Sequence, residues 1–227
     1  MNTLALTRLL QLASPVLPVG AYTYSQGLEW AVESGVIRDE ASAGRWIGDL
    51  LTHGIGRFEV PLLAGLMAAW SVQDAAEVAR LNSEFLASRE SAELRAETVQ
   101  MGFSLKRLLA DLRDEALAPV QAVLANLPET AFPTAWAGIA AIWNIAPGDA
   151  LAAYLWSWAE NQVMAALKAV PLGQAAGQRL LAELGARIPA IADAALTLPE
   201  SDWSNFAPAF AIASARHETQ YSRLFRS

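Results

Sequence analysis

The stretch 94-LRAETVQMGFSLKRLLADL-112 carries the clearest periodic pattern in this sequence. Its large apolar residues recur at separations of 7, 4, 3 and 4 positions: Leu94, Met101, Leu105, Leu108 and Leu112. These separations place all of them on one face of an α-helix. Arg89 and Glu93 lie four positions apart around the start of this run, and we expect them on the polar side of the same helix. The stretch therefore predicts a helix that packs one face against a core.

Helical spacing continues in both directions from this stretch. Towards the N-terminus, Asp39 is a plausible N-cap for a helix that ends near Gly54 and Gly56. Towards the C-terminus, Pro147-Gly148-Asp149 indicates a new helix, which stops before Pro171. We expect the last quarter to be divided by three more prolines: Pro189, Pro199 and Pro208.

The fold class follows from the dominance of this pattern. No stretch alternates apolar and polar residues with the β-branched enrichment typical of strands. Alanine, the best helix former, supplies 46 of the 227 residues. No repeat, linker or domain boundary is visible, so residues 1–227 are predicted to form a single all-α domain. We expect a bundle of about nine or ten helices.

One segment near the start, residues 13–29, does not have helical spacing. Residues 1–21 are expected to be an N-terminal segment followed by a proline-rich loop, and the irregular stretch continues to Glu29. An ordinary surface loop with an N-cap is one interpretation. The alternative is a rigid platform that presents Tyr22, Tyr24 and Glu29. The candidate platform residues are Pro15, Pro18, Gly20, Tyr22, Tyr24 and Gln26.

The other irregular segment is the C-terminus, residues 214–227. From Ile212 onward the chain holds three Arg and one Glu, a net charge of +2, so a total of −7 leaves −9 for residues 1–211. A frayed last helix is one interpretation. The other is an anchor that orders on a partner, with Tyr221, Leu224 and Phe225 as apolar contacts and the arginines as directional donors.

Composition excludes several classes of function. The chain has no Cys and two His, which excludes thiolate metal sites and an all-imidazole metal centre within one chain. Two Lys and a net charge of −7 argue against a nucleic-acid-binding surface. No phosphate-binding loop and no nucleophile motif occurs. Prolines interrupt the charge-free stretches 9–28 and 130–148, so we expect no membrane span and a cytoplasmic protein.

Three motifs together resemble the UreF family of urease accessory proteins. The first runs from Leu12-Ala13-Ser14-Pro15 to Gln26-Gly27-Leu28-Glu29, with Ala21 where the family often has Gly. The second is Leu167-Lys168-Ala169-Val170-Pro171 within the stretch 163–174, and the third, the most specific, is the segment 214–227. The resemblance spans the chain from near its start to its end.

The resemblance implies an all-α homodimer that is not an enzyme and that bridges UreD (also called UreH) and the GTPase UreG. It implies regulation of that GTPase and delivery of nickel to apo-urease, with nickel and GTP handled by the partners and no cofactor bound directly. By analogy, Glu29 and Lys168 would lie on a surface that faces UreG. The implied UreD side comprises Arg216, His217, Glu218, Tyr221, Arg223, Leu224, Phe225 and Arg226.

Two other functions are left open by the residues themselves. One is an α-helical metal-dependent enzyme with a buried carboxylate site, although no Asp-Asp-x-x-Asp pattern occurs. The other is a helical sensor that encloses an apolar ligand, which eight Trp would suit. The enzyme would require a buried group of carboxylates, and the sensor would require an enclosed cavity.

Overall fold

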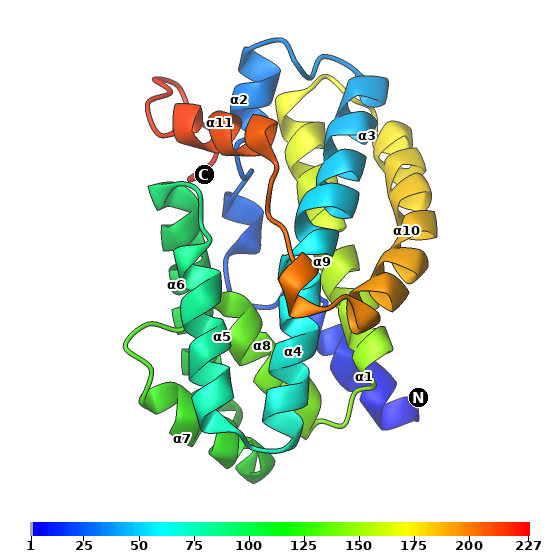
Figure 1. Ribbon diagram of the computed structural model, residues 1–227. Helices are drawn as coiled ribbons and strands as arrows, with labels where there is room; N and C mark the ends of the chain where they lie inside the picture. Colours follow the sequence, from blue (N-terminus) through cyan, green and yellow to red (C-terminus); the bar gives the residue numbers. More distant parts are fainter. Residues whose placement is uncertain (1) are drawn as a thin grey trace.

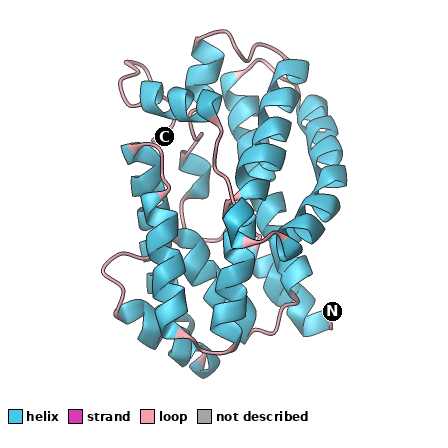
Figure 2. Cartoon of the chain, in the orientation of Figure 1, coloured by secondary structure: helices cyan, strands magenta, loops and turns pink. Residues whose placement is uncertain are grey.

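The computed structural model describes residues 2–227, and Met1, the first residue of the expected N-terminal segment, lies outside them. No β-strand occurs among the described residues (Figure 2), which confirms the all-α class. The α-helices are α1 (Thr3–Leu12), α2 (Leu28–Glu33), α3 (Glu40–Asp49), α4 (Glu59–Ser71), α5 (Ala75–Ala87), α6 (Ala92–Leu112), α7 (Ala118–Ala125), α8 (Phe132–Ile142), α9 (Pro147–Ala169), α10 (Gln174–Thr197) and α11 (Pro208–His217). Short 3-10 turns cover Ala21–Thr23, Ile55–Arg57, Glu115–Leu117 and Glu200–Asp202.

The bundle is built around α4, which packs against α8, α5, α9 and α10. Its apolar residues cover the whole circumference of the helix, which is typical of a helix buried on all sides. Its neighbour α8 exposes almost nothing and is rich in small residues, with Ala135, Ala137 and Ala140 fully buried. Small side chains bring these helix axes close together, so part of the high Ala content lies in the core.

The long helices α9 and α10 form one side of the bundle, and α5 and α6 form the opposite side (Figure 1). The face predicted for residues 94–112 is confirmed: Leu94, Met101 and Leu105 are buried, and Leu108 and Leu112 pack against the core. Asp39 caps α3 as predicted, since its carboxylate accepts the Ser42 N–H at 2.8 Å. The helix beginning at Pro147 and ending at Ala169 is also confirmed.

One predicted helix end is confirmed and one is wrong. α3 passes into a π-helical turn (Leu50–Gly54) that ends at Gly54, as predicted, and the 3-10 turn Ile55–Arg57 leads on to α4. Gly56 also serves a close approach, because a Cβ there would lie 2.6 Å from the Ile191 side chain of α10. Pro189 lies inside α10 and does not end it; α10 visibly curves (Figure 1), as proline in a helix favours.

The expected placement of Arg89 is also wrong. α6 begins at Ala92 with Ser91 as its N-cap, so Arg89 precedes the helix rather than lying on its polar face. Its guanidinium is nine-tenths buried and pairs with the Glu59 carboxylate of α4 at 3.4 Å. A charge that looks solvated in the sequence is therefore part of the interior.

At one end of the bundle, α11 lies across the start of α6 and beside α2 (Figure 1). The irregular residues 218–227, called the tail below, continue from it. No helix in the range 2–227 combines the length and apolar character that crossing a membrane requires.

Candidate functional site

The tail folds back onto the bundle and ends beside residues 23–29. Residues 214–217, expected to belong to the irregular segment, form the last turn of α11. Phe225 and Ser227 are buried, whereas Tyr221 and Leu224 are exposed. The tail thus has an inner side that contacts this chain and an outer side that faces solvent.

Glu29 anchors the inner side of the tail. Its carboxylate accepts the backbone N–H of Leu224 at 2.7 Å and of Phe225 at 3.0 Å. It also lies 3.3 Å from Nε2 of the buried His217. Glu29 is 7% exposed, so the expectation that it lies on a partner-facing surface is wrong for this conformation. The tail covers it because a carboxylate is the natural acceptor for two adjacent backbone donors.

His217 connects two carboxylates and contributes nothing to the protein surface. Its Nδ1 lies 2.7 Å from Oε2 of Glu93, while Nε2 faces Glu29. Both ring nitrogens therefore lie within hydrogen-bond distance of a carboxylate. Glu93 also accepts a hydrogen bond of 2.8 Å from Arg223. His217, expected among the partner contacts, is instead the internal link between α11, α6 and α2.

The end of the tail is bound by the turn before α2. The backbone oxygen of Ser227 accepts the N–H groups of Ser25 and Gln26 at 2.6 and 3.0 Å, and the Ser25 hydroxyl at 2.6 Å. The Ser227 hydroxyl donates to Glu97 at 2.8 Å, and the Gln26 amide donates to the same carboxyl at 2.7 Å. We call Ser25, Gln26, Glu29, Glu97 and His217 the tail seat.

Lys168 and Tyr22 border the tail seat on the solvent side. The Lys168 ammonium lies 5.4 Å from the Phe225 ring centroid and 6.0 Å from that of Tyr22, within range of cation–π attraction. Both Lys168 and Tyr22 are exposed. Lys168, expected to face one partner, and Phe225, expected to face another, therefore meet at one place.

The loop before α2 is only partly the expected platform. Pro15, Pro18 and Tyr22 are exposed, whereas Tyr24, like Glu29, is buried. Gly20 adopts the left-handed region with φ +78°. Gly27 does the same, and a Cβ on it would lie 2.7 Å from the backbone nitrogen of Ser214. Only glycine at position 27 lets α11 lie this close.

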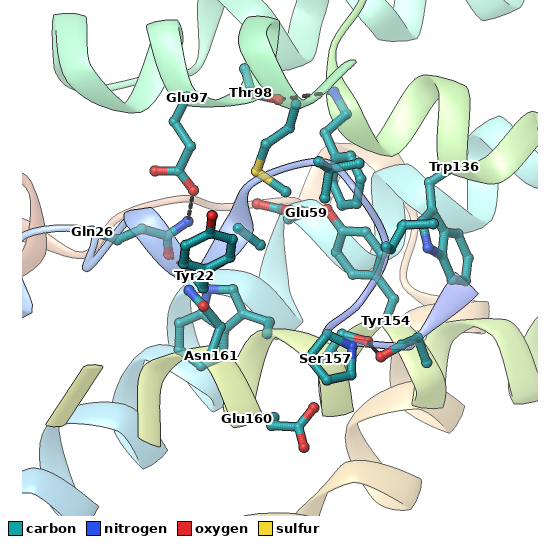
Figure 3. A pocket seen from close by; sticks show the side chains of 18 of the residues that line it. Tyr22, Gln26, Glu59, Glu97, Thr98, Trp136, Tyr154, Ser157, Glu160 and Asn161 are labelled. Carbon is teal, nitrogen blue, oxygen red and sulfur yellow. Dashed lines mark hydrogen bonds between the residues drawn. The ribbon is translucent and has the colours of Figure 1, made fainter. Parts of the chain in front are cut away.

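A cavity of about 110 Å³ lies beneath this loop, between α4, α6, α8 and α9. Glu59, Glu97 and Tyr154 project into it from three helices (Figure 3). The Tyr154 hydroxyl donates to Glu59, and burial beside this carboxylate raises the pKa of Tyr154 well above its usual value. Gln26 lies at one side, its amide oxygen accepting the Trp158 indole N–H at 2.8 Å.

A metal-dependent enzyme would require buried carboxyls, and a sensor of an apolar ligand would require a cavity. The structure has both features, but the two carboxyls are already hydrogen-bonded to other side chains of this chain. Glu59 accepts from Arg89 and Tyr154, and Glu97 accepts from Gln26 and Ser227. Among residues 2–227, no three His, Asp or Glu side chains lie close enough together to hold a metal ion. These contacts give both carboxyls a structural role.

The start of α6 is tied to α11 and to the tail. The Ser91 hydroxyl accepts the Leu94 N–H at 3.1 Å and lies 2.6 Å from the Ser214 hydroxyl. Glu218 accepts the N–H of Ala92 at 2.8 Å, where the positive end of the helix dipole favours a carboxylate. The first tail residue thus extends the N-cap of α6.

Replacing Ser91 by Ala is expected to lower the free energy of unfolding by about 1–2 kcal/mol, because the α6 cap is lost and the Ser214 hydroxyl loses its buried partner. Urea unfolding followed by circular dichroism measures the change. Ser83→Ala is the matched control, since the exposed Ser83 hydroxyl bonds only within α5. Equal stability of the two variants would contradict the assigned role of Ser91.

Comparisons with known proteins give a consistent result over nearly the whole chain. A sequence model of the family described as UreF matches residues 37–185. The chain is 75% identical over 224 residues to the urease accessory protein UreF of Dechloromonas aromatica (strain RCB), covering 99% of this chain and 98% of the relative. It is 68% identical over 225 residues to that of Azoarcus sp. (strain BH72), with 99% and 96% covered. For the one from Methylobacillus flagellatus the identity is 52% over 223 residues, with 98% of each covered.

Proposed function

The chain belongs to the UreF family of urease accessory proteins, and on that premise we propose that it serves urease assembly as a bridging protein rather than as an enzyme. It joins UreD (UreH) to the GTPase UreG and regulates that GTPase while nickel is inserted into apo-urease. It works through protein contacts as a homodimer in the cytoplasm, and its partners hold the nickel and the nucleotide.

The observation that carries the proposal is the two-sided tail. Its inner side is fixed by the tail seat, while Tyr221 is fully exposed and Leu224 is 71% exposed. Arg216, Arg223 and Arg226 are also exposed around them. Aromatic and arginine side chains supply much of the binding energy at protein interfaces. This face is the contact we propose for UreD.

The UreG side is proposed to lie next to this face, at Lys168 and Tyr22. Lys168 is exposed and makes no salt bridge within residues 2–227, so its charge is available to an acidic partner. Glu29 acts on this side through the tail, because its carboxylate is buried beneath Leu224 and Phe225. Because the tail contributes to both surfaces, binding of UreD is coupled to binding of UreG.

Replacing Tyr221 and Leu224 together by Ala is expected to weaken capture of UreD at least tenfold, because both exposed apolar contacts are lost while the inner side of the tail stays bound. Co-expression with UreD and UreG, pull-down, and light scattering of the eluted complex measure capture and subunit number.

Val72→Ala provides the control for that experiment, since Val72 is 74% exposed at the turn between α4 and α5, away from the tail. Undiminished capture of UreD by the double variant would reject the tail face as the contact. Recovery of neither partner with the unchanged chain would reject the bridging function itself.

A further inference from the structure

Glu97 differs from the other carboxylates that bind the tail. Its side chain is buried in the wall between the cavity and the tail, and both oxygens accept from neutral donors, Gln26 and Ser227. It makes no salt bridge within the described part of the chain. Glu93, by contrast, pairs with Arg223 and His217.

The groups around Glu97 come from every element packed on it. They are Glu59 from α4, Arg89 before α6, Tyr24 and Gln26 from the loop, Tyr154 and Trp158 from α9, and Ser227 from the tail, with Arg226 beside Tyr24. Burial is the largest influence and raises the pKa of Glu97 to about 7, with Gln26 and Ser227 opposing that rise. The positive charge of Arg89, which lowers the pKa of Glu97, is already paired with Glu59.

We propose that Glu97 links docking of the tail to protonation, so that the tail binds its seat more tightly below neutral pH and opens more often above it. The Ser227 hydroxyl can accept a hydrogen bond from a protonated Glu97 as readily as it donates to an ionised one. The proton removes the cost of a buried charge, and the docked tail adds to that burial because its Ser227 covers one oxygen of Glu97.

The size of the effect follows from proton linkage. When the tail leaves, Ser227 no longer covers Glu97, and water returns the pKa towards the ordinary value of 4.5. The docked state then holds more protons than the open state between these two values. The docking equilibrium therefore falls as pH rises through this window, by about tenfold between pH 6 and pH 8.

Hydrogen exchange of the full chain tests the proposal. The amides of Leu224, Phe225 and Arg226 are bonded to Glu29 and to the Thr23 carbonyl, so their protection factors report opening of the tail. After correction for intrinsic exchange, these factors are expected to fall about tenfold from pH 6 to pH 8. Amides in the middle of α9 serve as the internal reference for global opening.

The Glu97→Gln variant distinguishes the effect of this carboxyl on tail protection from the effects of other titrating groups. A neutral amide imitates the protonated carboxyl, so the variant is expected to keep high protection at pH 8 and to lose the tenfold fall. The same fall in both proteins would overturn the proposal.

A second measurement does not depend on any variant. The ¹³C shift of the Glu97 carboxyl in the unchanged protein is expected to titrate with a midpoint near 7. A midpoint close to the ordinary value of 4.5, in a protein whose tail amides are protected, would overturn the proposal as well.

Discussion

The Glu29→Gln variant is expected to release the tail from its seat while the helical bundle remains folded. The substituted amide has the same shape, but its NH₂ group faces a backbone N–H of Leu224 or Phe225, where only an acceptor fits. Hydrogen bonds to a charged group contribute about 1.5–3 kcal/mol each. Loss of one such bond, with a donor left unpaired, should raise the open fraction about a hundredfold, a change of about 3 kcal/mol.

Trypsin cleavage after Arg223 measures this release, because a protease cuts an open segment far faster than a docked one. Glu33→Gln is the matched control, since Glu33 lies one turn further along α2 and is exposed. Equal cleavage rates in the Glu29 and Glu33 variants would contradict the anchoring role of Glu29. A Glu29 variant with lost helical signal would instead show that the tail seat is needed for folding of the bundle.

The local features of this fold are predictable from the sequence. The spacing of Leu94, Met101 and Leu105 places their face correctly, and Asp39 caps the helix that it precedes. Such features depend on neighbours three or four residues away, whose chemistry is visible in the sequence itself. The Pro-Gly pair at Pro147 likewise sets the start of α9.

The tail seat is not predictable in the same way, because it joins distant parts of the chain. Glu29 and His217 are 188 residues apart, and Glu97 and Ser227 are 130 apart. A tail with two arginines looks solvated, and nothing local indicates that its backbone N–H groups bind a carboxylate. The motifs around Glu29 and in the tail were predicted to face different partners, yet they bind each other.

One overlooked signal lies inside the stretch 94–112. Glu97 is three residues after Leu94 and four before Met101, which places a carboxyl within the apolar face of the helix. A carboxyl at such a position must find hydrogen-bond donors or take up a proton. Gln26 and Ser227 are the donors here, and neither is near Glu97 in sequence.

Glu59→Ala is expected to destabilise the bundle more than any other single change considered. It leaves the nine-tenths buried Arg89 guanidinium without its carboxylate and removes the acceptor of the Tyr154 hydroxyl. Removing one partner of a buried ion pair costs about 3–5 kcal/mol. For a chain of this length that loss lowers the midpoint of thermal unfolding by about 10 °C, measured by calorimetry.

A double-mutant cycle distinguishes loss of the pair from loss of one side chain. Glu59→Gln with Arg89→Met removes both charges and leaves no buried ion unpaired, so the double variant should be more stable than Glu59→Ala. Tyr154→Phe removes only the hydroxyl contact and should cost about 1 kcal/mol. If the effects of the two single substitutions simply add in the double variant, Glu59 and Arg89 do not stabilise each other. The carboxyl in the cavity would then need another explanation, such as contact with a bound ligand.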